Sequence, residues 1–578
     1  MRSRSLAKLS LVLMIVIFVS SCQTPNQSGN QNNAAQPAHE WDKFVSDFLE
    51  AHFKANPDFA ARAGRHEFDG KLPDWSAAGI SGEIKRLHDT RDRAMAFTDA
   101  TLDERQRLQR DYLVSVVNGQ LFWLETAEWP YRNPYFYADG IDPDVYVSRE
   151  YAPLDQRLRA YTNYARAIPA ALAQVRQNLR TPLPKSYVKI GHTSFGGLVS
   201  FYEKQVPEIF ASVKDEQLQK DFQAANAGAI AAMKDIDSWF TSLEATATDN
   251  FALGADKFSA MLKATEGVDF PLDKLEEVGR RDLDRNLAAL KDACGSYAAG
   301  KSLKECVDQA EAHKPVGGAV EMARAQLKEL KAFIAEKNLV SIPGTEEALV
   351  AEAPVYRRWN FAYINIPGPY EKNLPSTYYI APADESWTQA EKDAYTPGQA
   401  NLLFTSVHEV WPGHFLQFLH ANRSTEKFGR VFVGYAFAEG WAHYTEEMMF
   451  DSGVGGGTPE MHVGQLLNAM LRNVRFLSAI GMHTGKMTTA DSERMFIEEG
   501  YQDAGTARQQ AARGTFDPAY LNYTMGKLMI RKLRDDWCAS RGGKQAWQQF
   551  HDEFLKYGGP PIPLVRKAML PGDSGALF

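Results

Sequence analysis

The stretch LLFTSVHEVWPGHFLQFLHA, residues 402–421, contains the residues around which the fold has to be built. Apolar residues precede His408 and follow His414, as in a helix that enters and leaves a buried position. On a regular helix, two side chains six positions apart point about 240° away from each other. Between the histidines, Pro412 lacks an N–H for the helix, and Gly413 tolerates backbone angles that other residues avoid. We therefore predict a loop-out or widened turn that brings both rings together.

Two histidines and a glutamate in this order form a variant of the HExxH motif, in which both histidines bind one zinc ion. A catalytic zinc site also needs a third protein ligand and an open position. Glu439 follows His414 by 25 residues, which is enough for a helix, a connection and a returning helix. It lies among Phe437, Ala438, Gly440 and Trp441, where an unpaired carboxylate is costly. We predict His408, His414 and Glu439 as ligands of a single Zn²⁺.

Other residues near these ligands leave alternatives open. Glu439, His443 and Glu446 share one helix face, so one could bind the metal while another orients a ligand. His420 and His443 are alternative ligands, and Glu439 could instead be an ordinary surface carboxylate. Glu409, next to His408, is the candidate general base that takes a proton from metal-activated water.

The first residues have the pattern of a targeting segment. Residues 1–22 show a basic start, an apolar run from Leu9 to Val19 and small residues before Cys22. This pattern resembles a bacterial lipobox, which predicts a lipid-modified Cys22; a plain secretory signal or a short membrane anchor is the alternative. Gln23 in place of aspartate resembles lipoproteins of the outer membrane. Residues 23–39 are polar and predict a disordered tether.

Composition narrows the classes of function. The chain has 578 residues, 44% hydrophobic and 24% charged, as in a globular protein. Its net charge of −8 and the lack of a basic stripe argue against nucleic acid as a partner. Outside the cytoplasm a disulfide can form, and Cys294 and Cys306 are the plausible pair, which leaves Cys538 free. No close cysteine pair supports a cysteine-based zinc site.

Hydrophobic periodicity predicts a mainly helical protein. Leu283, Leu287, Leu290 and Cys294 form an apolar stripe, and further helices are expected around 97–127, 155–180, 214–246 and 318–336. The stretch WNFAYINIPGPYEKNLPSTYYIAPAD instead predicts short strands joined by a turn. We expect a large helical two-lobed body with a deep cleft and a small sheet beside the active site. Its predicted parts are a helical region over 40–350 and a catalytic region over 351–578.

Four motifs in order, HEVWPGH, AEGWAHYTEE, RNVRFLSAIGMH and YTMGK, resemble the bacterial proteins grouped as domain of unknown function 885. The resemblance is strongest over roughly 350–530. These proteins look like gluzincin-type zinc peptidases, similar in design to helical thimet-type oligopeptidases. The resemblance implies His408, His414 and Glu439 as zinc ligands and Glu409 as base.

The same resemblance implies further site residues. Tyr523 would donate a hydrogen bond to the oxyanion, with core packing as the alternative. His483 would contact the substrate or the transition state, although Ala479 stands where the family has an acid. Arg475 would pair with a substrate carboxylate or with Glu446.

The strand STYYIAP would lie beside the cleft and hold an extended peptide by its main chain. Tyr378 and Tyr379 on this strand are therefore candidates for substrate binding, with core packing as the alternative.

These observations together predict a zinc-dependent hydrolase of peptide or related amide bonds. It would sit on the periplasmic face of the cell envelope, anchored by lipid to a membrane. The alternative is a lipid-anchored periplasmic binding or scaffold protein with an inactive peptidase-like cleft. Retention of both histidines, Glu409 and Glu439 argues against this alternative.

Overall fold

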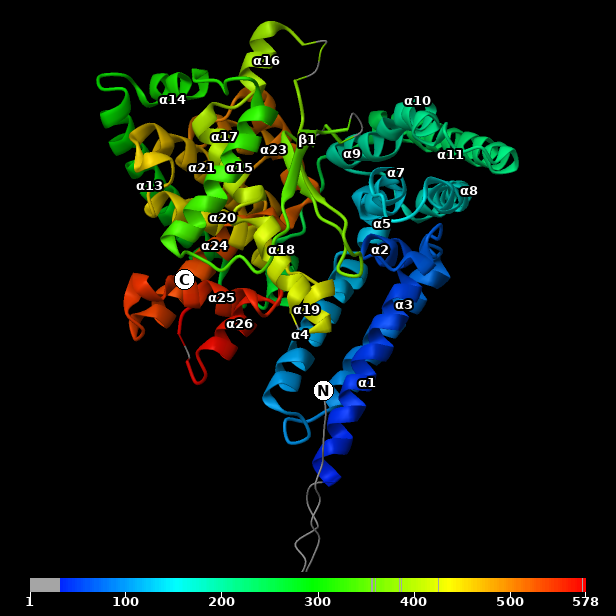
Figure 1. Ribbon diagram of the computed structural model, residues 1–578. Coiled ribbons are helices and arrows are strands. Elements are labelled where there is room, and N and C mark those ends of the chain that lie inside the picture. The colour runs from blue at the N-terminus through cyan, green and yellow to red at the C-terminus, as the bar shows by residue number, and fades with distance from the viewer. Residues whose placement is uncertain are drawn as a thin grey trace, which may run out of the picture.

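The computed structural model describes residues 32–354, 357–358, 360–383, 385, 387–424, 426–573 and 575–578. The chain is mainly helical with one three-stranded sheet, which confirms the predicted fold class. Figure 1 shows a large body formed by the later helices and a smaller body formed by α5 to α11. The predicted leader, with Cys22, lies outside the described residues.

Eleven α-helices make up most of the N-terminal region that the structure describes. They are α1 (Asn32–Ala55), α2 (Pro57–Arg62), α3 (Ala77–Ala96), α4 (Glu104–Leu121), α5 (Trp129–Arg132), α6 (Ala138–Ile141), α7 (Asp144–Ser148), α8 (Leu154–Asn178), α9 (Lys185–Phe195), α10 (Val199–Phe210) and α11 (Glu216–Leu243). Helix α1 begins within the predicted tether 23–39, so residues 32–39 form its first turns.

Two apolar cores stabilise this region. Apolar side chains of α8 and α11 at helical spacing, such as Leu158, Tyr161 and Phe222, are buried together in one core. Residues of α1, α3 and α4 form the other core, which also takes in Phe428 and Phe432 from the C-terminal half. The first helices are therefore packed directly against the later part of the chain.

Four helices connect the N-terminal region to the sheet: α12 (Ala255–Glu266), α13 (Leu272–Tyr297), α14 (Leu303–Ala312) and α15 (Ala319–Lys337). The apolar stripe predicted at Leu283, Leu290 and Cys294 faces the largest core. A disulfide joins Cys294 of α13 to Cys306 of α14, as the sequence predicted, and Cys538 is free and buried.

The sheet consists of β1 (Ala348–Glu352), β2 (Ala362–Asn365) and β3 (Ser376–Ile380), in the order β1-β3-β2. Strands β2 and β3 pair antiparallel, as expected for two strands joined by a turn, and β1 pairs parallel with β3. Because β3 is central, its main-chain groups pair on both sides. Strand β2 is an edge strand among the described residues.

The remaining helices form the body that contains the four sequence motifs. They are α16 (Gln389–Tyr395), α17 (Gln399–Glu409), α18 (His414–Arg423), α19 (Lys427–Val431), α20 (Tyr435–Asp451), α21 (Pro459–His483), α22 (Thr489–Glu498), α23 (Ala504–Phe516), α24 (Asn522–Ala539), α25 (Trp547–Leu555) and α26 (Ile562–Met569). Helix α21 is buried almost continuously from Val463 to His483, and it packs against α13 and α17.

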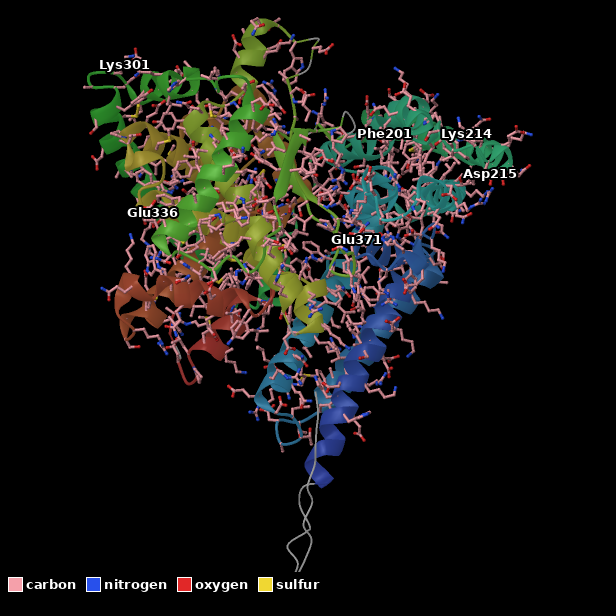
Figure 2. All side chains as sticks on the ribbon, in the orientation of Figure 1. Phe201, Lys214, Asp215, Lys301, Glu336 and Glu371 are labelled. Carbon is pink, nitrogen blue, oxygen red and sulfur yellow. A yellow bond between two sulfur atoms is a disulfide. The ribbon has the colours of Figure 1, made fainter. Side chains whose placement is uncertain are left out.

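The connection between β2 and β3 joins the two bodies. Glu371 lies at this junction in Figure 2, and its buried carboxylate accepts a hydrogen bond from Arg149 at 2.8 Å. Arg149 also donates to the Arg62 carbonyl, and the Tyr370 N–H donates to the Ala63 carbonyl. These bonds attach the loop after β2 to the N-terminal helices.

None of the described helices combines the length and the apolar character that a membrane span requires.

The disulfide provides a test of the fold. Replacing Cys294 and Cys306 by alanine should lower the free energy of unfolding by about 3 kcal/mol, because a bridge of this loop length restricts the unfolded chain. Chemical denaturation under oxidising conditions measures the loss. A reductant should lower the stability of the unchanged protein to the level of the variant and leave the variant as it was. Equal stability of the two oxidised proteins would contradict the prediction.

Candidate metal centre

The segment between the two histidines interrupts the helix. Helix α17 ends at Glu409 and α18 begins at His414. The Gly413 N–H donates to the Val407 carbonyl, six residues earlier, at 3.0 Å, whereas a regular helix uses the carbonyl four residues earlier. The rings of His408 and His414 consequently meet, with centroids 4.8 Å apart. The predicted widened turn is present, and it is large enough to divide the segment into two helices.

Two contacts define the shape of this turn. A Cβ atom on Gly413 would lie 1.8 Å from the His408 carbonyl oxygen, so no other residue fits without moving the backbone. The Trp441 indole N–H donates to the Pro412 carbonyl at 2.8 Å. Trp441 belongs to α20, so this bond ties the turn to the helix that carries Glu439.

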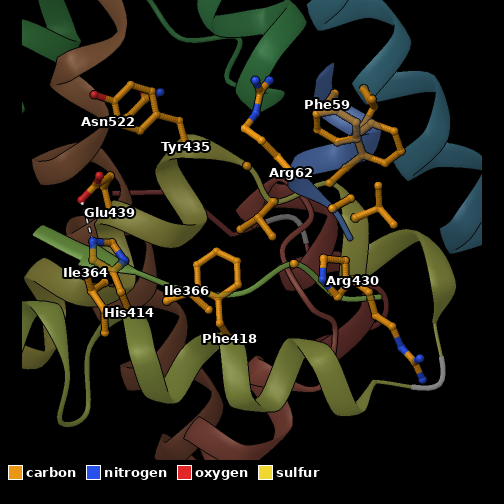
Figure 3. Close-up of a pocket in the computed structure, with 18 of the residues that line it drawn as sticks. Phe59, Arg62, Ile364, Ile366, His414, Phe418, Arg430, Tyr435, Glu439 and Asn522 are labelled. Carbon is orange, nitrogen blue, oxygen red and sulfur yellow. Dashed lines mark ion pairs between the residues drawn. The ribbon is translucent and has the colours of Figure 1, made fainter. Parts of the chain in front are cut away.

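Glu439 faces both histidines. Its Oε2 atom lies 3.3 Å from His408 Nε2 and 3.2 Å from His414 Nε2, and Figure 3 shows the contact with His414. Among the described residues, these three side chains form the one group of possible ligands, with all ligand atoms within 4.8 Å of one another. The three residues predicted as ligands are therefore brought together.

Glu446 determines which His408 nitrogen carries the proton. Its Oε1 atom lies 2.7 Å from His408 Nδ1, and because a carboxylate accepts hydrogen bonds, Nδ1 is the protonated nitrogen. The lone pair of His408 is then on Nε2 and points at Glu439, itself an acceptor. For His408 this accounts for the missing hydrogen bond to the buried Oε2 of Glu439, which has no hydrogen bond of regular geometry among the described residues although it lies close to both histidines. A metal cation bound by these atoms would satisfy all of them.

The environment of Glu446 keeps it ionised. Burial alone would raise its pKa, but the charge of Arg472 and the contacts with His443 and His408 hold that pKa below its ordinary value. Arg472 Nη2 lies 3.2 Å from Glu446 Oε1, and His443 Nδ1 lies 3.2 Å from Glu446 Oε2. Burial lowers the pKa of His443 to about 3, so this ring is neutral. Glu446 thus contacts His408 on the side away from Glu439, and His443 in turn contacts Glu446.

The three candidate ligands open into a cavity of about 840 Å³ that is lined by the N-terminal helices α2 and α4, by β2 with the loop after it, and by helices of the larger body. Glu409 and Tyr523 also line it, and Glu409 is half-buried. Figure 3 shows Phe59 and Arg62 from α2 on the side of the pocket away from His414 and Glu439. The predicted base and the predicted phenol donor therefore share one cavity with the ligands.

Tyr523 is surrounded by three arginines, whose guanidinium carbons lie 4.8 to 5.9 Å from its ring centre: Arg475, Arg472 and Arg513. Burial and the nearby Glu439 carboxylate raise the pKa of Tyr523 although the arginines oppose the shift. The phenol is consequently protonated at neutral pH and able to donate a hydrogen bond into the cavity.

Two residues predicted from the family motif lie elsewhere. His483 is fully buried outside the cavity lining, where its Nε2 lies 2.8 Å from the Gly514 carbonyl. Burial lowers its pKa to about 4, as for a neutral core histidine. Arg475 is not in the cavity lining; it donates to Gln510 at 2.8 Å and stacks on Tyr523. Arg472, one helical turn earlier, is the partner of Glu446.

The tyrosines of β3 are also outside the cavity lining. Tyr378 is fully buried in the largest core, and Tyr379 packs against Tyr363 with ring centres 5.3 Å apart. The strand beside the cavity is β2, since residues 362–365 line it. The sequence analysis placed the right pair of strands beside the cleft but assigned substrate binding to the central strand β3. Alternation in one sequence does not reveal the order of the strands in a sheet.

The alternative ligand His420 lies outside the candidate site. His420 Nε2 lies 2.8 Å from the Ser341 carbonyl, away from the ligand group.

The sequence analysis did not identify three residues that surround Tyr523 or Glu446: Arg472, Arg513 and Tyr435. The RNVR motif contains both arginines of α21. Because they lie about one helical turn apart, Arg472 could have been predicted as a second basic residue near the site.

A family model described as bacterial protein of unknown function (DUF885) matches residues 57–569. The chain is similar to a candidate lipoprotein of unknown function from Shewanella oneidensis, at 21% identity, with a TM-score of 0.76 over 92% of this chain and 99% of the other. It is likewise similar to a candidate lipoprotein from Colwellia psychrerythraea, at 17% identity, with a TM-score of 0.77 over 92% and 98%. The search of curated proteins found no match.

The oligoendopeptidase F described for Bacillus anthracis str. Ames is 12% identical and covers 84% of this chain and 94% of its own. Its TM-score of 0.30 is too low for the likeness to carry an argument.

The turn at Gly413 provides a test of the site geometry. Gly413→Ala should lower the free energy of unfolding by about 1–3 kcal/mol, because the new methyl group collides with the His408 carbonyl. Gly295→Ala is the matched control, since Gly295 lies in helix α13 with open space around it. That control should be stabilising by about 0.5–1 kcal/mol. Denaturation of both variants measures the difference, and equal effects would show that the turn is not tightly packed.

Proposed function

The chain belongs to the DUF885 family of bacterial proteins, whose function is unknown, and we propose that it is a zinc-dependent hydrolase of peptide bonds. One observation carries the proposal: His408 Nε2, His414 Nε2 and Glu439 Oε2 converge at the wall of the cavity. Three acceptors that face one another need a cation between them. Two imidazoles and one carboxylate are the ligand set of a catalytic zinc ion.

The residues fit one Zn²⁺. Glu439 supplies a negative charge and the histidines supply neutral nitrogens, with the carboxylate of Glu446 behind His408. A zinc ion held here would supply Lewis acidity, which lowers the pKa of water and polarises a substrate carbonyl.

The remaining steps belong to side chains of this protein. Glu409 follows His408 directly and faces the same cavity, so its carboxylate takes the proton from the attacking water and passes it to the leaving amine. Tyr523, protonated in its buried position, donates a hydrogen bond to the oxyanion that forms at the carbonyl. Glu409 and Tyr523 can serve the same peptide bond only if the substrate lies directly in front of the three proposed ligands.

Strand β2 is suited to hold such a peptide. Residues 362–365 line the cavity, and no described strand pairs with the outer edge of β2. An extended peptide can therefore add to this edge through main-chain hydrogen bonds.

The protein would act at the cell envelope. The lipobox-like sequence that ends at Cys22 supports a lipid anchor, and two structural relatives are described as candidate lipoproteins. The disulfide between Cys294 and Cys306 also fits a compartment outside the cytoplasm. We propose attachment to the outer membrane with the catalytic body on the periplasmic side.

The role of Glu409 is tested by Glu409→Gln. The variant should keep its zinc and lose about 10²–10⁴-fold in kcat/KM on a peptide library, because it lacks the base but no metal ligand. Metal analysis and peptide cleavage by mass spectrometry measure both quantities. Full activity in the variant, or protein without zinc after purification free of chelators, would refute the mechanism. A protein that holds zinc and binds peptides without cutting any would instead be a binding protein.

The ligand assignment is tested by Glu439→Gln and Glu446→Gln, two isosteric changes on the same helix. Glu446→Gln should weaken zinc binding about 10–100-fold, because it removes the carboxylate behind His408. Glu439→Gln should weaken zinc binding further, since it removes a ligand. Competition with a fluorescent chelator measures both affinities. Equal losses would mean that Glu439 is not the third ligand.

A further inference from the structure

A buried acid that the proposed mechanism does not use lines the same cavity. Glu266 ends helix α12, and only 2% of its surface is exposed. The end of a helix carries partial negative charge, so an acid placed there lacks support from its own helix. Burial raises the pKa of Glu266 to about 8. An unpaired carboxyl in such a place needs an explanation.

Only part of the hydrogen-bonding capacity of Glu266 is used. Its Oε1 atom accepts from the Asn522 side-chain amide at 2.9 Å, and the Ala436 N–H at the start of α20 also lies against the carboxyl. The Oε2 atom is buried and has no partner among the described residues, and the same holds for Asn522 Oδ1. The pair therefore presents two oxygens without a hydrogen bond: Asn522 Oδ1, which accepts, and Glu266 Oε2, which accepts once the carboxyl has lost its proton to pair with a cation.

A third acceptor comes from α4. The Oε1 atom of Gln120 is also buried without a partner in the described part of the chain, and Gln120 lines the cavity together with Glu266 and Asn522. The adjacent residue Gly119 packs closely on α12: a Cβ built there would lie 3.6 Å from the Thr265 Cα. Gln120 and Glu266 thus come from two packed helices.

Among the residues that the structure describes, none of those lining the cavity offers this group an unpaired basic side chain. Arg62 and Arg430 line the cavity, but Arg62 pairs with Asp58, and Arg430 donates to the Ser424 carbonyl. Trp123, in the π-helical turn Phe122–Thr126 that continues α4, also lines the cavity. Three oxygen acceptors and an indole ring are features that attract a cation with several N–H donors.

We propose that Gln120, Glu266 and Asn522, with Trp123, form a subsite for a primary ammonium group of the peptide substrate, an inference that rests on the proposed hydrolase function. An ammonium group has three N–H donors for the three free oxygens and a charge for the Glu266 carboxylate. Two sources have this chemistry: the free α-amino group at the start of a peptide and the side chain of lysine.

The position of the subsite relates it to the bond that is cut. Ala436, which lies against Glu266, precedes Glu439 by one helical turn, or ~5 Å along the axis. Asn522 directly precedes Tyr523 in the chain, and Figure 3 shows Asn522 on the same side of the pocket as Glu439. The bound ammonium group therefore belongs to the same short stretch of substrate as the reacting carbonyl.

Three matched peptides of alanine test the proposal: one with a free amino terminus, one N-acetylated, and one N-acetylated with lysine in place of one alanine. The full-length protein should cut the first or the third at least about tenfold better, in kcat/KM, than the second, as expected for a hydrogen-bonded charge. A preference for the first assigns the α-amino group, and a preference for the third assigns lysine. Equal rates on all three would overturn the proposal.

Two variants assign the preference to the subsite. Glu266→Gln should reduce the preference about tenfold with zinc content retained, and Gln120→Glu, which adds a second carboxylate, should increase it. Because Glu266 also contacts α20, Gln120→Met serves as a second test that leaves this contact in place; it should reduce the preference by a smaller factor. A preference that survives both Glu266→Gln and Gln120→Met would overturn the assignment.

A binding measurement separates failure of the subsite from failure of the proposed function. Calorimetric titration of Glu409→Gln with the three peptides reports recognition without cleavage. If the protein cuts nothing but still binds an amine-bearing peptide at least about tenfold tighter than the N-acetylated alanine peptide, the hydrolase proposal fails and the subsite stands. If it cuts all three peptides and binds them equally, the hydrolase proposal stands and the subsite fails.

Discussion

The structure depends on the convergence of His408, His414 and Glu439 at the wall of the cavity, with two imidazole nitrogens turned toward one carboxylate oxygen. Such an arrangement is unfavourable by itself, because acceptors do not bond with one another and burial penalises the carboxylate. It persists because the Glu446 carboxylate holds the proton of His408 on Nδ1 and Arg472 balances the charge of Glu446. The surrounding fold thus stabilises a site that becomes fully satisfied only with a cation.

The rest of the architecture can be understood as support for this convergence. The break at 410–413 turns His414 toward His408, and Trp441 fixes the break to α20. Helix α21 brings Arg472 behind the ligands. Residues of α2 and α4 and the loop after β2 line the far side, so the three candidate ligands face a cavity of about 840 Å³.

The sequence was most informative where the chemistry is local. His408, Glu409 and His414 lie within seven residues, and the Pro412–Gly413 pair gave a physical reason for their spacing. Glu439 followed from its apolar setting. Strand order and the partners from distant segments could not be read in this way: Arg472 reaches Glu446 from another helix, and Glu266 reaches Asn522 across 256 residues. His483 shows the limit of a transferred motif, since the acid expected at Ala479 was absent and the ring bonds to the Gly514 carbonyl.

The account is tested most directly by locating the metal. A crystal of the protein purified without chelators, measured on both sides of the zinc absorption edge, should show one anomalous peak at about 2.0–2.2 Å from His408 Nε2, His414 Nε2 and a Glu439 oxygen. Tyr523 and Glu409 should face the open side of this peak. The absence of a peak, or a peak bound by other residues while the two histidine rings point apart, would contradict the account.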